Sequence, residues 1–522
     1  MNNGQLRYIC LLVILFGCAG GVCVDAQKSA GRPEKPASRD ADREISRERP
    51  PEILNLITIV EWSPPEFAAD MLITIAESEK VTDVNWKKQL LEEAFHSATD
   101  CQYRIPQRAV GPYPTDTRAG FLAMAFGLKL DTLSLQCRAI QSMLPLDKAR
   151  ARQLFSEIER IKFPALSCGD GLVYEVSDFY KTAGNLFKEA FSSEEVRRGD
   201  RIRFLESLIE DTSSPLQIVP VANLIRSLEM SRAQRESAVA AFAAKLAKVS
   251  GDDRSFSSSI YSADDEIGRL VHVCNEQGVS AIELIKAQRS YYVRHFGSSR
   301  CSDTLRNVGD KGLLPHEINE FNARVRALGD KKISEIEADD VKPSKLEGKV
   351  DVHFYWESAE SAKLMRDFKQ LRFGSGLKPL TFAEMDNLQW KLSLREFLAS
   401  LSNWRQEDDK ESAEDYYHQK CNLFEALLGT LPAGPERDDV NRQFVNLLCE
   451  FDVKRAGRIE WFWHAKNLLP GKLGKPDGAR NANLIALLEA SSNTVMYAYV
   501  QVWKALSSPA SATPPASLPP NL

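Results

Sequence analysis

The sequence predicts an all-α protein that consists of antiparallel pairs of helices. Three observations lead to this fold class. Apolar residues recur at helical spacing along most of the chain, short polar turns separate the apolar segments, and only one short run alternates as a strand would. That run, residues 350–356, has no second strand in the sequence to pair with, so we expect an extended connector there.

Four segments carry the helical pattern most fully. In each of them apolar side chains return every three or four residues and therefore lie on one face of a helix. The sets are Leu90, Leu91, Ala94, Phe95 and Ala98; Val239, Phe242, Leu246 and Val249; Leu394, Phe397, Leu398 and Leu401; and Val440, Phe444, Leu447, Leu448 and Phe451.

Short polar turns predict that neighbouring helices form antiparallel hairpins. Each hairpin leaves an apolar face that the next one must cover, which predicts an irregular α-solenoid. The expected pairs are residues 68–76 with 83–98, 221–230 with 235–249, and 416–431 with 437–451, joined by residues 77–82, 231–234 and 432–435.

Residues 135–164 resemble a degenerate tetratricopeptide repeat. That repeat places small residues where paired helices cross and a large residue where repeats stack. The matching positions are Ala139 on the first helix, Ala151, Phe155 and Ile158 on the second, and the closing Pro164; Leu91, Phe95 and Ala98 fit the same second-helix pattern. The resemblance implies a tetratricopeptide-like stack. The whole chain also resembles uncharacterised exported bacterial helical-repeat proteins, a likeness that implies no activity.

The first residues predict a signal peptide, residues 1–26. Arg7 precedes the apolar run 8–16, which is much shorter than the ~20 residues that span a bilayer, and Ala26 ends a small-x-small cleavage pattern. We therefore expect an exported protein, periplasmic or extracellular. A membrane anchor is one alternative. Another is a membrane-anchored lipoprotein, because residues 15–18 resemble a lipobox in which Cys18 would be lipidated, although Phe16 is bulky for that motif.

Composition divides the remaining chain into segments. Two stretches are rich in proline and polar residues and cannot bury enough apolar surface to offset their ordering entropy. The predicted order is a disordered tether at 27–51, an N-terminal helical-repeat region at 52–328, a charged linker at 329–349, a C-terminal helical region at 350–506 and a disordered Pro/Ala/Ser tail at 507–522.

Charge and cysteine usage narrow the possible functions. The formal net charge of −5 gives no electrostatic reason to expect nucleic acid as a partner. Seven cysteines follow residue 26 and are too scattered for a small disulfide scaffold, so one to three structural disulfides are expected in an oxidising compartment. The parity of the cysteine count favours lipidation. If Cys18 is lipidated, Cys23 stays in the mature chain, and the other cysteines are then even in number, so all of them could pair.

No sharp catalytic, metal-binding or cofactor motif occurs, so no catalytic residue, metal or cofactor is predicted. His418 and Cys421 lie one helical turn apart and could ligate a metal. Core packing is the favoured interpretation, because Cys421 also continues an apolar stripe. Cys168 could act as a nucleophile if a histidine approached it, but a disulfide or another structural role is favoured.

Residues 460–464 form an acidic and aromatic cluster that contains Glu460, Trp461, Trp463 and His464. Such side chains could stack on a sugar or bind a protein partner. The favoured interpretation is an anchor in which Trp461 or Trp463 packs against a terminal helix within 495–506.

The function that we expect from the sequence is that of an exported, non-enzymatic scaffold that binds a protein or peptide partner. Helical arrays offer extended surfaces for such contacts. The alternative is an exported all-α carbohydrate-active enzyme, a glycoside hydrolase or lyase, with Glu460 as the one acid to nominate. Contact with a membrane is expected only through a lipid anchor.

Overall fold

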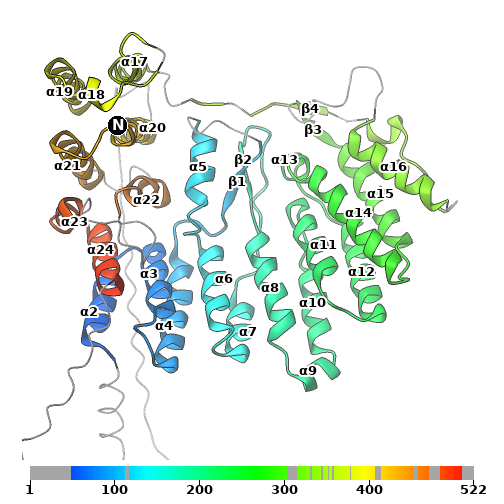
Figure 1. Ribbon diagram of the computed structural model, residues 1–522. Helices are drawn as coiled ribbons and strands as arrows, with labels where there is room; N and C mark the ends of the chain where they lie inside the picture. Colours follow the sequence, from blue (N-terminus) through cyan, green and yellow to red (C-terminus); the bar gives the residue numbers. More distant parts are fainter. Residues whose placement is uncertain are drawn as a thin grey trace, which may run out of the picture. The chain divides into compact units, whose positions relative to one another are not determined.

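Helices account for most of the structure, which confirms the all-α class (Figure 1). The computed structural model describes residues 49–111, 117–302, 314–329, 332–342, 345–350, 352–354, 358–376, 378–405, 413–450, 457–469 and 482–507. Arg49 to Leu522 form one compact unit. The predicted signal peptide, Cys18, nearly all of the tether and nearly all of the tail lie outside the described residues.

The helices of the N-terminal part run from residue 51 to residue 328. Their bounds are α2 Pro51–Val60, α3 Pro65–Glu77, α4 Val84–Ser97, α5 Arg118–Phe126, α6 Thr132–Met143, α7 Lys148–Glu157, α8 Ser177–Glu189, α9 Ser193–Arg197, α10 Asp200–Glu210, α11 Ile218–Ser227, α12 Arg232–Leu246, α13 Asp253–Ser257, α14 Ile260–Glu276, α15 Ile282–Phe296 and α16 His316–Leu328.

Most of these helices pack as two neighbouring rows. One row consists of α4, α6, α8, α11, α14 and α16, each in contact with the next, and a second row contains α10, α12 and α15. Contacts of α8 with α10, α11 with α12 and α15 with α16 join the rows (Figure 1). The apolar stripes predicted within α4 and α12 lie in this core, since Leu90, Phe95, Val239 and Phe242 are all buried.

The C-terminal helices return to the beginning of the unit. α20 contacts α17 and α21, α21 contacts α23, α23 contacts α24, and α24 packs on α2 and α3 (Figure 1). Asp70 on α3 accepts a hydrogen bond from the Tyr499 hydroxyl on α24 at 2.7 Å. The bounds are α17 Ala359–Phe373, α18 Phe382–Met385, α19 Leu388–Asn403, α20 Ala413–Thr430, α21 Pro435–Glu450, α22 Arg458–Lys466, α23 Ala482–Glu489 and α24 Thr494–Ser507.

Capping residues explain where several helices begin. The side chains of Asp83, Asp131 and Asp147 accept hydrogen bonds from backbone N–H groups in the first turns of α4, α6 and α7. Ser231 and Gln234 form a reciprocal capping box, so α12 begins at Arg232. The sequence-based interpretation of residues 231–234 as a turn was therefore wrong, because these residues form the helix start. The turn predicted at 432–435 also ends one residue early, since Pro435 is the first residue of α21.

Four short strands and three short 3₁₀ segments complete the elements of the described residues. β1 (Gln107–Ala109) pairs antiparallel with β2 (Leu172–Tyr174), and β3 (Ser299–Cys301) pairs parallel with β4 (Lys345–Glu347). Within the expected connector 350–356, Phe354 forms an isolated antiparallel bridge with Thr117. The 3₁₀ segments are η1 Ala98–Asp100, η2 Pro215–Gln217 and η4 Ala338–Val341.

Residues 135–164, which resemble a tetratricopeptide repeat, contain most of α6 and all of α7. Ala139, Ala151 and Phe155 are buried. Ile158 ends α7 and is partly buried, and Pro164 is exposed in the extended segment that follows.

Candidate functional site

The surface at α18 and the start of α19 exposes large apolar side chains. Leu388 is 74% exposed, Phe382 65% and Leu392 41%. Leu388 and Leu392 lie one helical turn apart on the same side of α19. We refer to these three residues as the α18–α19 face. Exposed apolar side chains that lie next to one another, as Leu388 and Leu392 do, are a feature of sites that contact other proteins.

Capping residues set where the two helices of the α18–α19 face begin. The Thr381 side chain and Glu384 form a capping box that begins α18, and Asn387 accepts the Trp390 N–H to begin α19. The Trp390 indole Nε1 donates to the Leu371 carbonyl oxygen on α17 at 2.9 Å, so the two helices are held together by a side chain as well as by packing.

A cavity of about 670 Å³ lies between α17 and α19 and is bordered by α18. Its lining combines apolar surface from Trp390 and Phe397 with the carboxylates of Asp367, Glu384 and Glu396. Among the described residues that line it there is no Lys or Arg. The cavity therefore favours a group that is partly apolar and carries a positive charge.

The structure buries most of the residue 460–464 cluster. Glu460 is 1% exposed, and Trp461 and His464 are 0% exposed, whereas Trp463 is partly buried. Consecutive residues of a helix point in different directions, so Glu460, the tryptophans and His464 contact different parts of the molecule. In this conformation Trp461 offers no face to a sugar.

The two tryptophans differ in their surroundings. The Trp461 ring packs edge-on against Phe67 of α3, with 6.2 Å between the ring centroids, and its Nε1 donates to the Leu448 carbonyl oxygen at 3.1 Å. Trp463 lies under the Lys466 ammonium at 5.1 Å. It is Phe462, between the two, whose ring contacts Tyr499 of α24, with 4.8 Å between the centroids.

Glu460 reaches back to the start of its helix. One carboxylate oxygen, Oε1, accepts a hydrogen bond from the Tyr103 hydroxyl at 2.8 Å. The other, Oε2, lies where a side chain at Gly457 would be, since a Cβ there would be 2.0 Å from it. Burial is the main reason that the pKa of this carboxyl is raised.

A second buried network joins α20 to α22. The Glu425 carboxylate lies 2.7 Å from His464 Nδ1, and His464 Nε2 lies 3.1 Å from His418 Nδ1. Phe121 of α5 stacks on His464 and lies 4.0 Å from His418 between ring centroids. Burial, followed by the neighbouring His464, lowers the pKa of His418 well below its ordinary value.

This network orients two imidazoles in the interior. His418 and His464 are fully buried, and neither is among the described residues that line the three cavities given in this section. Cys421, which the sequence places one turn from His418, is also fully buried on α20. Sequence reasoning found His464 and Glu460 but missed Tyr103 and Glu425. These two residues lie far away along the chain, so spacing gives no signal.

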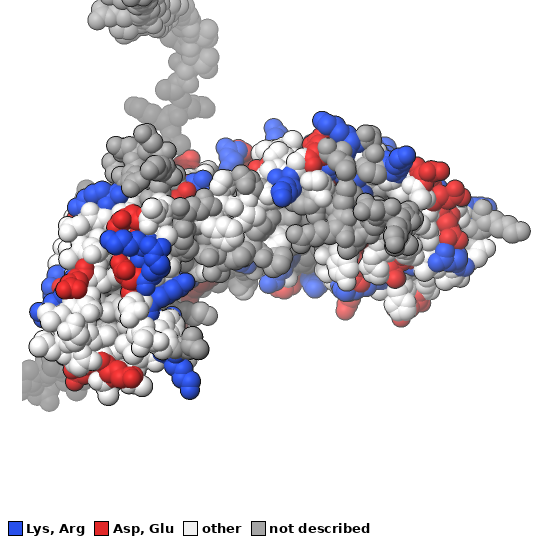
Figure 2. All heavy atoms as spheres, turned by 90° about the horizontal axis from the view of Figure 1, so that it is seen from above, with Lys and Arg blue, Asp and Glu red and all other residues white. Residues whose placement is uncertain are grey.

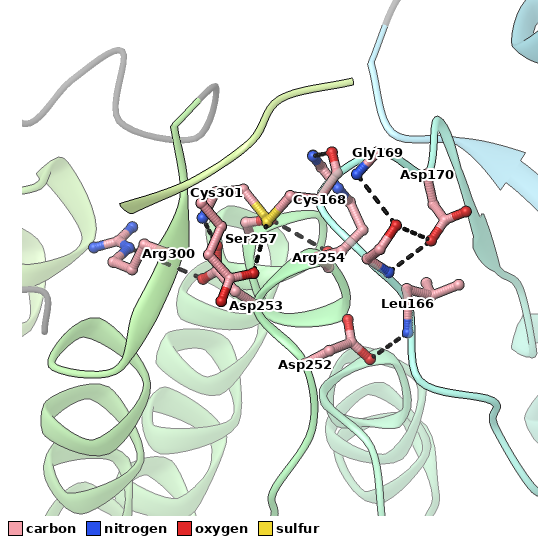
Figure 3. The surroundings of a disulfide bond; sticks show 12 residues. Leu166, Cys168, Gly169, Asp170, Asp252, Asp253, Arg254, Ser257, Arg300 and Cys301 are labelled. Atoms are coloured by element: carbon pink, nitrogen blue, oxygen red, sulfur yellow. Dashed lines mark hydrogen bonds and ion pairs between the residues drawn. A yellow bond between two sulfur atoms is a disulfide. The ribbon is translucent and has the colours of Figure 1, made fainter. Parts of the chain in front are cut away.

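Cys168 forms a disulfide with Cys301, so its thiol is not available as a nucleophile (Figure 3). The bond joins residues 133 positions apart and ties the segment before β2 to β3. The Arg254 guanidinium donates to the Cys168 carbonyl oxygen, and the Leu166 N–H donates to Asp252 at 3.1 Å. The described part of the chain thus contains a disulfide of the structural kind that the sequence led us to expect.

Two further cavities, of about 430 and 560 Å³, share the lining segment 160–162. Both charge signs are present in each: Arg104 and Glu157 line the first, and Lys245 and Asp211 line the second. Neither sign dominates, so these cavities do not favour one class of charged ligand.

Replacing Glu460 with glutamine is expected to change how stability depends on pH. Because burial raises the folded-state pKa, the protonated carboxyl contributes stability below the unfolded pKa of about 4.3, and this contribution is lost as pH rises through the raised value. Glutamine cannot ionise. The variant should therefore gain stability relative to the wild type as pH rises from about 4 to about 7, a trend that urea denaturation at several pH values would measure.

The control for this experiment is Glu283→Gln, whose side chain is 74% exposed. Because its exposed ion pair with Lys286 contributes only about 0–1 kcal/mol, the stability difference of this variant from the wild type should change less than that of Glu460→Gln over the same pH range. A Glu460→Gln difference that changes no more than that of the control would contradict the inferred burial penalty on the carboxylate.

Within the described residues, no helix combines the length and the apolar character needed to cross a membrane. Comparisons of the chain with family models, with curated proteins and with solved structures found nothing that matches it.

Proposed function

We propose that the chain is an exported, non-enzymatic helical scaffold whose α18–α19 face binds a protein partner. The observation that carries this proposal is the exposure of Phe382, Leu388 and Leu392 beside the acidic cavity between α17 and α19. A partner that suits this surface presents apolar side chains next to a Lys or Arg, because the cavity supplies both apolar walls and carboxylates.

Export is supported by the Cys168–Cys301 disulfide, because such bonds form and persist in oxidising compartments. The predicted signal peptide at residues 1–26 is compatible with this location. Lipidation at Cys18 remains the alternative form of the same proposal, in which the scaffold is attached to a membrane surface.

The contacts between helices favour the solenoid part of the proposal. Each helix of the row from α4 to α16 contacts its neighbours in that row, as repeats do when they stack. We infer that the helices of this row, together with the helices that pack beside them, form an irregular, tetratricopeptide-like array.

The distribution of surface charge favours a protein partner over nucleic acid. Lys/Arg and Asp/Glu are intermixed on the face that Figure 2 shows, whereas a nucleic-acid interface needs a basic patch.

The carbohydrate-enzyme alternative gains no support from the site that suggested it. Glycoside cleavage needs two carboxyl groups on either side of an accessible sugar. Glu460 is buried and bonded to the Tyr103 hydroxyl. Trp461, which would have to stack on the sugar, is buried beside it.

A photo-crosslinker placed on the α18–α19 face tests the proposal. With benzoylphenylalanine in place of Leu392, illumination of producing cells should yield one dominant adduct of higher mass. The matched control replaces Tyr261 of α14, an aromatic residue that is 67% exposed outside this face. Adding Leu388→Glu to the Leu392 variant should reduce the adduct about tenfold or more, because a charged group would enter the apolar contact.

The outcomes are distinct. An adduct at 392 that Leu388→Glu removes supports the proposed surface, and an adduct of twice the chain mass would identify a second copy as the partner. Equal labelling at positions 392 and 261, or no adduct at 392 in a chain with a normal helical circular dichroism spectrum, would refute it.

A further inference from the structure

Three possible metal ligands from distant parts of the chain meet at the disulfide. Cys168 precedes β2, Asp253 begins α13 and Cys301 ends β3 (Figure 3). Both sulfur atoms and a carboxylate oxygen of Asp253 all lie within 4.8 Å of one another. Thiolate and carboxylate are ligand types that zinc takes in proteins.

The Asp253 carboxylate is buried and only half satisfied. Its side chain is 7% exposed. Oδ2 accepts the Cys301 N–H, whereas Oδ1 has no hydrogen bond and lies 3.9 Å from Arg300 Nε. A buried carboxylate oxygen without a hydrogen bond is destabilising unless another ligand compensates. Its long ion pair with Arg300 compensates only in part, so Oδ1 could accept a further ligand.

We propose that reduction of the disulfide converts Cys168, Cys301 and Asp253 into a binding site for a zinc-like divalent ion. The Cα atoms of the two cysteines are 5.3 Å apart, so both side chains already converge on one point. Two thiolates on a tetrahedral zinc ion lie about 3.8 Å from each other, given Zn–S bonds of about 2.3 Å. Small side-chain rotations would provide this separation.

A fourth ligand is available at the same place. Glu347 of β4 has Oε2 3.8 Å from Cys168 Sγ, and its side chain is 43% exposed, which leaves it room to rotate. Either this carboxylate or a water molecule would complete a tetrahedral shell.

The surrounding charges suit a bound cation together with two thiolates. Arg254 and Arg300 are 1% and 3% exposed. The Arg254 guanidinium donates to the Cys168 carbonyl oxygen, and Arg300 Nε lies 3.9 Å from Asp253 Oδ1. Two thiolates, the carboxylates of Asp253 and Glu347, two guanidinium groups and a divalent ion together have no net charge.

The chemistry of the conversion balances with a dithiol as reductant. The dithiol gives two electrons and two protons to the disulfide, which becomes two thiols, and the reductant itself becomes a disulfide. Binding of the divalent ion then releases the two thiol protons to solvent. Since the same sulfur atoms serve both states, disulfide and metal exclude each other. This inference does not depend on the proposed partner-binding function.

Cobalt(II) is a suitable probe because it substitutes for zinc and its thiolate complexes absorb in the near ultraviolet and visible. The full chain is reduced, freed of reductant under anaerobic conditions and titrated with Co²⁺. We expect thiolate-to-cobalt and tetrahedral bands that saturate at one ion per chain and disappear when Zn²⁺ is added. The oxidised chain should show none of them, and it is a folded control of identical sequence.

Variants assign the ligands. Cys168→Ser with Cys301→Ser should abolish the bands, and Asp253→Asn should weaken cobalt binding about tenfold or more. Cys449→Ser, at a half-buried free cysteine, should leave them unchanged. Bands that persist in the Cys168/Cys301 variant would overturn the proposal. So would unchanged affinity in Asp253→Asn, absence of bands in the reduced chain, or loss of its helical circular dichroism on reduction.

Discussion

Replacing Trp461 with alanine should lower the free energy of unfolding by about 3–5 kcal/mol, the range for removing a fully buried tryptophan. The side chain is 0% exposed and packs on Phe67. The change leaves a cavity between α22 and α3 and leaves the Leu448 carbonyl oxygen without its indole donor. Urea denaturation followed by circular dichroism would measure the loss.

Two other tryptophans provide graded controls. Trp463→Ala, two residues further along α22 and only partly buried, should cost about 1 kcal/mol. Trp62→Ala, at 73% exposure, should stay within about 0.5 kcal/mol of the wild type. If all three variants lost similar stability, α22 would not be the internal anchor described above.

Removing the disulfide is the other change with a large expected effect. Cys168→Ser with Cys301→Ser should lower the free energy of unfolding by about 2–5 kcal/mol, because the bond closes a long loop in the unfolded chain. Its two ends are 133 residues apart. The unfolding midpoint of the wild type in urea should fall in a dithiol reductant, with metal ions removed by a chelator.

The double variant is also the control for the reductant. Its own midpoint should be the same with and without dithiol, because the described free cysteines form no other bond to reduce. If dithiol did not change the wild-type midpoint, the Cys168–Cys301 bond would have no stabilising role.

Helices were predictable because their information is local. The stripe of Leu90, Leu91, Ala94 and Phe95 repeats at the spacing of one helical face, and all four are buried on α4. The first and last residues of the helices were harder to predict from the sequence. The polar residues 231–234 have the composition of a turn, and only the hydrogen bonds of the capping box reveal that they begin α12.

Strands and site contacts depend on long-range pairing. β1 and β2 are three residues each, too short to show alternation, and each exists because the other lies beside it. The same holds for the bond between Tyr103 and Glu460, 357 residues apart in the chain. For the α18–α19 face a local signal did exist: Leu388 and Leu392 are apolar but fall off the buried stripe of Leu394, Phe397 and Leu401.

The contact of α24 with α2 and α3 has a consequence for the order in which the molecule is made. Asp70 and Tyr499, which are bonded in the folded chain, are 429 residues apart. During synthesis the first helices emerge long before α24, so the sides of α2 and α3 that α24 covers stay uncovered until α24 has been made. Closing so long a loop is slow. Such late closure suits the export that we propose, because a chain without its final packing can still be threaded through a translocation channel.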